Sequence, residues 1–230
     1  MNIKFVTFII VFFCLIIPKQ SNSQSTYQFG VLPSISLNKK LEKDWSVNFK
    51  TESRLLIQNG DFKGNHNKEF EYLLTDISLI AAKKVGLNSR VAGGYLIRLR
   101  NGEAIHRTIQ QFSIVKSKTG YRLAHRFAAD QTFSSNQSPE FRFRYRITPE
   151  VPLNGQTVDP KEFYIKTNFE LLNKFQSSDY ELELRVVPLL GYTLNEQNKF
   201  EFGLDYRFDS LFISDPRHSF WTSINWYFNF

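Results

Sequence analysis

The clearest regular pattern in the chain is the stretch Glu140-Phe141-Arg142-Phe143-Arg144-Tyr145-Arg146-Ile147-Thr148. Polar and apolar residues alternate at every position, so in an extended chain the aromatic side chains and Ile147 share one face while the arginines share the other. A helix, with its period of about 3.6 residues, would not separate the two kinds of side chain in this way. The stretch therefore predicts a β-strand with one apolar face and one strongly basic face.

The same alternation recurs along the chain and predicts eleven strands. The sharpest further examples are 180–186 and 199–208, and the pattern in 45–57 becomes less clean toward Ile57. The other predicted strands are 26–36, 69–82, 88–99, 105–117, 121–134, 162–174 and 218–230. Most of these segments are long enough for a tilted membrane strand, which needs about 9–11 residues, whereas a soluble strand has about five or six. Strand length therefore indicates a transmembrane barrel.

The composition fits the same architecture. Aromatic residues make up 16% of the chain, with 23 Phe, yet the mean hydropathy is negative. Past residue 23 no apolar run approaches the ~18 residues that a membrane-spanning helix needs. A barrel reconciles these facts, because it alternates lipid-facing apolar residues with polar ones. A secreted β-sandwich that binds a ligand is the alternative, although such domains rarely sustain so many long strands.

The predicted fold is an all-β, antiparallel, up-and-down transmembrane barrel of about 10–12 strands. Single-chain bacterial barrels usually have an even number of strands. Eleven segments then imply either one missed strand, giving twelve, or a 26–36 segment that lies outside the wall, giving ten. We favour twelve.

The N-terminal residues predict a secretory signal peptide. Lys4 is followed by an apolar run over 5–17, which has the length of a signal-peptide core and is too short to span a membrane. Ser21 and Ser23 are small residues two positions apart, so cleavage is expected after Ser23, leaving one barrel domain over 24–230. An uncleaved N-terminal anchor is the alternative.

Removal of residues 1–23 determines which chemistry remains available. The only cysteine, Cys14, would be lost, so the mature chain would have neither a disulfide nor a thiol nucleophile. The mature chain would carry 27 Lys and Arg against 22 Asp and Glu, a net charge of +5. No Lys/Arg stripe of the kind that binds nucleic acid is present, so no nucleic-acid partner is expected.

The last predicted strand ends in alternating aromatic residues, Trp226, Phe228 and Phe230. This ending is typical of the signal by which the barrel assembly machinery recognises outer-membrane proteins. We therefore expect outer-membrane lipid and that machinery as partners, and a monomer exported through the secretory pathway to the outer membrane.

Several short pieces of the chain resemble a family of Gram-negative outer-membrane barrels. They are 41–46, 93–95, 106–112, 141–146, 163–164 and 168–171. The family is catalogued as the domain of unknown function number two thousand four hundred and ninety. The resemblance implies a barrel in the outer membrane, and it implies no activity, because none is attached to the family.

If the aromatic face meets lipid, the opposite face lines a narrow lumen. The candidate lumen-lining residues are Arg122, Arg126, Asp130, Arg142, Arg144, Arg146, Glu181, Glu183, Arg185 and Asp205. Pairing across the 134–138 turn would bring Asp130 close to Arg142. Either the charges pair with each other and fill a structural barrel, because unpaired buried charge is costly, or the arginines line a porin-like passive path for small anions.

A hydrolase is a third reading. His125 could lie beside Ser113 on a lipid-facing surface, as in an outer-membrane phospholipase, with the histidine activating the serine. No third, orienting residue stands at a matching position, so we do not expect an enzyme. The four histidines are scattered, and neither a metal nor another cofactor is expected.

Overall fold

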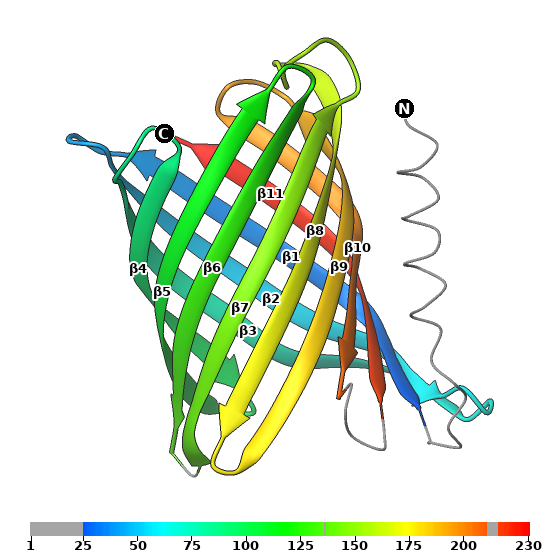
Figure 1. The fold of residues 1–230 in the computed structure, drawn as a ribbon. Helices are drawn as coiled ribbons and strands as arrows, with labels where there is room; N and C mark the ends of the chain where they lie inside the picture. Colours follow the sequence, from blue (N-terminus) through cyan, green and yellow to red (C-terminus); the bar gives the residue numbers. More distant parts are fainter. Residues whose placement is uncertain (1–24, 136, 211–215) are drawn as a thin grey trace, which may run out of the picture.

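The computed structural model of the protein describes residues 25–135, 137–210 and 216–230 (Figure 1). Each of the eleven predicted segments corresponds to one strand. The strands are β1 (Thr26–Lys40), β2 (Trp45–Asp61), β3 (His66–Lys84), β4 (Ser89–Arg100), β5 (Glu103–Lys118), β6 (Tyr121–Ser134), β7 (Gln137–Pro152), β8 (Glu162–Gln176), β9 (Asp179–Thr193), β10 (Asn198–Asp209) and β11 (Arg217–Asn229). The predicted signal peptide, 1–23, lies outside the described residues.

The strands form one closed barrel, which confirms the predicted up-and-down architecture. Consecutive strands pair antiparallel, and β1 closes the ring by pairing in parallel with β11, from Thr26 opposite Arg217 to Asn38 opposite Asn229. The preference for twelve strands is wrong, and so is a ten-stranded wall without 26–36. Each turn reverses the chain, so the first and last strands of an odd-numbered meander run in the same direction, and a parallel pair is what closes it.

The turns define two ends of the barrel. The β1–β2 end also holds the β3–β4, β5–β6, β7–β8 and β9–β10 connections, and β11 finishes there (Figure 1). The β2–β3 end holds the other connections. Its β4–β5 turn has Asn101 and Gly102 both at positive φ, 50° and 77°, which is the backbone of a tight hairpin turn.

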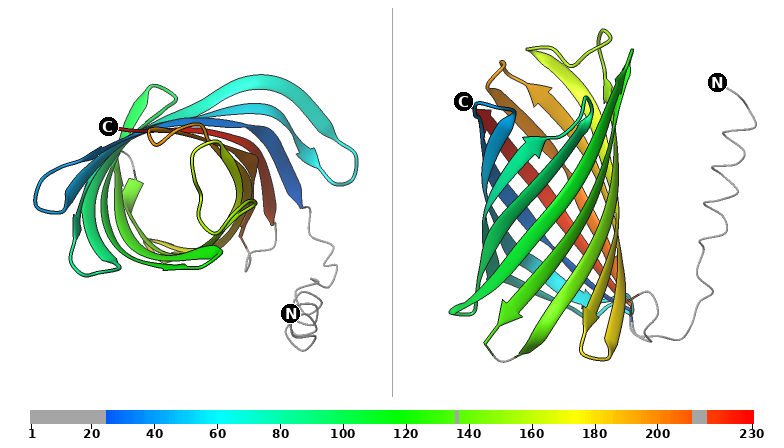
Figure 2. Two further views of the ribbon diagram at one scale, coloured as in Figure 1. Left: turned by 90° about the horizontal axis from the view of Figure 1, so that it is seen from above. Right: turned by 60° about the vertical axis from the view of Figure 1, so that its left-hand side comes forward.

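The β2–β3 hairpin is the least regular part of the wall. It extends sideways beyond the ring of strands (Figure 2). The pairing of β2 with β3 shifts between Arg54 and Leu55, and again between Leu56 and Gln58. A bulge adds a residue to one strand and breaks the strict alternation of faces. The pairing of β1 with β2 also shifts, between Phe29 and Gly30, and leaves Ile57 as the extra residue of β2, which accounts for the imperfect pattern of the sequence there.

The two faces of the barrel differ sharply in polarity. All eleven strands expose large apolar side chains on the outer face, among them Phe127, Phe143 and Phe202. The inner face is mostly polar, with a small apolar cluster of Leu32, Leu56 and Trp221. Among the residues that the structure describes, no helix is long and apolar enough to cross a membrane.

Candidate functional site: the charged interior of the barrel

Asp130 on β6 is the most deeply buried carboxylate of the interior, with 1% of its surface exposed. The β6–β7 register places it opposite Arg142. Arg142 Nη2 donates to Asp130 Oδ2 at 2.8 Å, and Arg144 Nη2 donates to Oδ1 at 2.8 Å. The contact expected between Asp130 and Arg142 is therefore present, and one carboxylate binds two arginines.

Glu170 on β8 is the second centre of charge and is only 3% exposed. Arg146 Nε donates to its Oε2 at 2.7 Å. Arg126 approaches the same oxygen at 3.5 Å, and Arg185 approaches Oε1 at 3.4 Å. Three guanidinium groups from β6, β7 and β9 thus surround one buried carboxylate, which makes their placement interdependent.

The remaining lumen candidates on β9 and β10 also form ion pairs. Glu183 pairs with Arg185 and with Lys174, the latter at 2.9 Å. Glu181 lies 3.3 Å from Lys174. Arg207 donates twice to Asp205, at 2.9 and 2.8 Å. All ten candidates lie on the inner face, and Arg122, the most exposed, is 3.4 Å from Glu150 near the β1–β2 end.

The interior holds separate cavities at its two ends. The cavity at the β1–β2 end measures about 950 Å³ and includes Arg122, Lys166 and Glu201 in its lining. The cavity at the β2–β3 end measures about 260 Å³. Asp130 and Glu170 line neither of them. A third inner cavity of about 240 Å³ adjoins Arg126 and Arg146. The ion pairs of Asp130 and Glu170 thus form a layer between the two ends.

Glu201 anchors the wall of the larger cavity. Tyr164 Oη donates to Glu201 Oε1 at 2.8 Å, Tyr227 Oη donates to Oε2 at 3.0 Å, and Lys166 pairs with the same carboxylate. The Tyr164 ring reaches Glu201 by lying over Gly191, where a Cβ atom would come within 2.1 Å of the ring. Glycine is therefore needed at this position for the close approach.

Four charged residues on the other side of the lumen were not predicted. Asp76 on β3 accepts two hydrogen bonds from Arg98 on β4, both at 2.7 Å. Arg54 on β2 and Arg107 on β5 also face inward, and neither forms an ion pair with a described residue. The alternation within β4 and β5 could have placed Arg98 and Arg107, but the polar residues Thr51 and Ser53 on the outer face of β2 obscured the alternation around Arg54.

The proposed pairing of Ser113 with His125 is not formed. The β5–β6 register sets Ser113 opposite Arg126 and His125 opposite Ile114. A difference of one position moves a side chain to the opposite face, so Ser113 faces inward and His125 faces outward. His125 Nδ1 instead shares a hydrogen bond with Tyr145 Oη at 2.9 Å.

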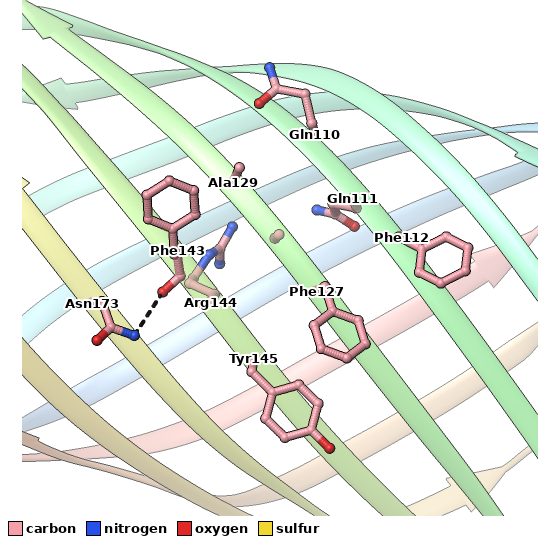
Figure 3. Close-up of a pocket in the computed structure, with 10 residues that line it drawn as sticks. Gln110, Gln111, Phe112, Phe127, Ala129, Phe143, Arg144, Tyr145 and Asn173 are labelled. Atoms are coloured by element: carbon pink, nitrogen blue, oxygen red, sulfur yellow. Dashed lines mark hydrogen bonds between the residues drawn. The ribbon is translucent and has the colours of Figure 1, made fainter.

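The outer face near His125 carries an apolar groove of about 490 Å³. Figure 3 shows Phe112, Phe127, Phe143 and Tyr145 around it. At its margin Gln110 and Gln131 exchange two hydrogen bonds, at 3.1 and 3.0 Å. The aromatic lining of the groove suits contact with apolar groups.

Three histidines form the same kind of contact on the outer face. His106, His125 and His218 each share a hydrogen bond with a tyrosine, at 2.8 to 2.9 Å. Each pair joins neighbouring strands. Within the described ranges, no group of three or more His, Cys, Asp or Glu side chains is arranged to hold a metal ion.

These features define a closed β-barrel with an apolar outer face and a charged interior in which most of the inward charges are paired. The chain belongs to the family described as "Protein of unknown function (DUF2490)", whose model matches residues 29–216. The match confirms the family resemblance of the sequence. No curated protein and no solved structure shows a significant match to the chain.

Proposed function

We propose that this protein is an integral β-barrel of the bacterial outer membrane, with a structural role and a lumen that its own ion pairs close. The observation that carries the closed lumen is the layer formed by Asp130 and Glu170 with five arginines. Removing either carboxylate would leave buried arginines without their counter-charge, so the layer resists opening.

The outer face supports the membrane location. Exposed large apolar side chains occur on every strand, whereas a soluble monomer rarely exposes contiguous apolar patches beyond a few hundred Å². The strands have 12 to 19 residues, enough to cross a bilayer at the tilt of a barrel. Lipid would cover this face, and the assembly machinery would insert the barrel, with Trp226 and Phe228 of β11 on the lipid side.

Two measurements test the proposal. Protein extracted in mild detergent from outer-membrane fractions should migrate differently in a gel before and after boiling, because a folded barrel binds less detergent than the unfolded chain. Reconstituted protein should then give no steady conductance across a planar bilayer. A soluble periplasmic protein without a mobility shift would refute the membrane location, and stable single-channel steps would refute the closed lumen.

A narrow passive channel for small anions is the second candidate. It is favoured by the cavity at the β2–β3 end, where Lys and Arg outnumber Asp and Glu by nine to three. Such a channel should give anion-selective steps. Neutralising Arg142, Arg144 and Arg146 together should abolish or reverse the selectivity, and unchanged selectivity would exclude a path lined by these arginines.

A further inference from the structure

The cavity at the β2–β3 end has more positive charge than its own carboxylates can neutralise. Its lining contains nine Lys and Arg residues but only three acids, Glu140, Glu183 and Asp209. Six of the nine cations have a carboxylate within 4.0 Å, and several of these carboxylates belong to acids that do not line the cavity. The other three, Arg54, Arg100 and Arg107, have no such partner among the described residues.

Two of these three arginines are held deep in the wall. The buried Nε of Arg54 has no hydrogen-bond partner. The nearby acids Glu52 and Asp76 are already bound, to Lys50 and Arg98. Arg107 is 5% exposed, and the structure gives it one hydrogen bond, from Nε to Thr132 Oγ1 at 2.9 Å. A buried guanidinium without a counter-charge is unfavourable, because it has lost its hydration and gained no equivalent attraction.

The fold brings the three arginines to the same part of the wall. Arg54 on β2 is opposite Leu74 on β3, whose next residue, Thr75, is opposite Leu99 on β4. Arg100 follows at the end of β4, and Arg107 on β5 is opposite Leu96 on β4. Three strands thus supply one unpaired guanidinium each to one cavity. Arg142, 7% exposed, lines the cavity from across the lumen and, like Arg54, has a buried Nε without a hydrogen-bond partner.

We propose that this cavity binds a small soluble anion through a phosphoryl group. Guanidinium groups from three strands need acceptor oxygens in several directions, and a phosphoryl group offers three strong ones, whereas a planar carboxylate offers two. The cavity of about 260 Å³ has room for about nine waters at ~30 Å³ each, enough for phosphate or pyrophosphate. Because the arginines lie inside the wall, a soluble anion reaches them more directly than a lipid headgroup does.

The test uses the full-length barrel in detergent and measures the temperature at which the unboiled gel band is lost. Inorganic phosphate and pyrophosphate are compared with chloride and acetate at equal ionic strength. Phosphate should raise that temperature in a saturable manner and acetate should not, since a ligand that binds only the folded state stabilises it. The variant Arg54→Met/Arg107→Met should lose at least about ten-fold in phosphate affinity, in line with loss of charged contacts.

Arg122→Met serves as the matched control, because Arg122 lines the cavity at the opposite end. It should keep the response to phosphate. Both variants must show the mobility shift of a folded barrel, and Arg54→Lys/Arg107→Lys, which keeps the charge, provides a second folded variant with intermediate affinity expected.

Three outcomes would overturn the inference: equal stabilisation by acetate and phosphate, an undiminished phosphate response in Arg54→Met/Arg107→Met, or stabilisation that appears only when vesicles containing phosphatidic acid replace the soluble anions in the same measurement. None of these bears on the membrane location or on the closed lumen, which the mobility shift and the conductance measurement test separately.

Discussion

The two sides of the lumen differ in how far their inward arginines are neutralised by carboxylates. On β6 to β9, Asp130 and Glu170 each bind more than one arginine within 3.5 Å. On β2 to β5 one bidentate pair forms, between Asp76 and Arg98, while Arg54 and Arg107 have no ion pair among the described residues. Both sides have inward arginines. Whether an inward arginine is neutralised therefore depends on whether a neighbouring strand places a carboxylate within reach of its guanidinium group.

The largest expected effect is on the paired side, at Glu170. Replacing it by glutamine keeps the shape but leaves Arg126, Arg146 and Arg185 without their shared carboxylate. Breaking a buried ion pair typically costs about 3–5 kcal/mol. Glu170→Gln should lower the free energy of unfolding by that amount, measured by urea unfolding of the barrel in lipid vesicles.

Glu181→Gln is the matched control for this change. Glu181 is on the same inner face, but its side chain is 28% exposed, and its one ion pair among the described residues is with Lys174. Exposed ion pairs contribute about 0–1 kcal/mol. A loss in Glu170→Gln no larger than in Glu181→Gln would mean that the buried layer is not the element that stabilises the interior.

A smaller effect is expected at the β1–β2 end, where Glu201 is bound by neutral as well as charged donors. Tyr164→Phe removes the hydrogen bond from Tyr164 Oη to Glu201 while keeping the ring over Gly191. A hydrogen bond to a charged group contributes about 1.5–3 kcal/mol. The same urea measurement should show a loss in that range, and Tyr192→Phe, on the outer face, should change it by much less. If both variants lost the same free energy of unfolding, the hydrogen bond from Tyr164 to Glu201 would not be a distinct contribution to stability.

The smallest change, and the one that contrasts the two sides most directly, is Arg54→Met. Because Arg54 has no ion pair with any residue that the structure describes, replacing it by methionine removes a charge that has lost its hydration and keeps much of the apolar stem. In phosphate-free buffer the variant should be within about 1 kcal/mol of the parent protein, or more stable than it. A loss as large as that of Glu170→Gln would mean that Arg54 is stabilised by a partner within the folded chain.

The sequence predicted the strands and their faces well, because both depend on local alternation. The run from Glu140 to Thr148 places its arginines inward and its aromatic residues outward, as the ion pairs of Arg142, Arg144 and Arg146 show. The contact between Asp130 and Arg142 was also predictable, since a short turn joins their strands. Arg54 was missed, because the outer face of β2 carries the polar residues Thr51 and Ser53 there, which blurs the alternation that would have marked it.

What the sequence alone determined is the set of eleven strands and the division of each into an apolar and a polar face, since these follow from the two-residue period of extended backbone. Only the tertiary structure decided the odd-numbered closure through β1 and β11, the separation of Ser113 from His125, and the ion pairs of the interior other than that of Asp130 with Arg142. These depend on register between strands, and a shift of one residue changes every partner across the lumen.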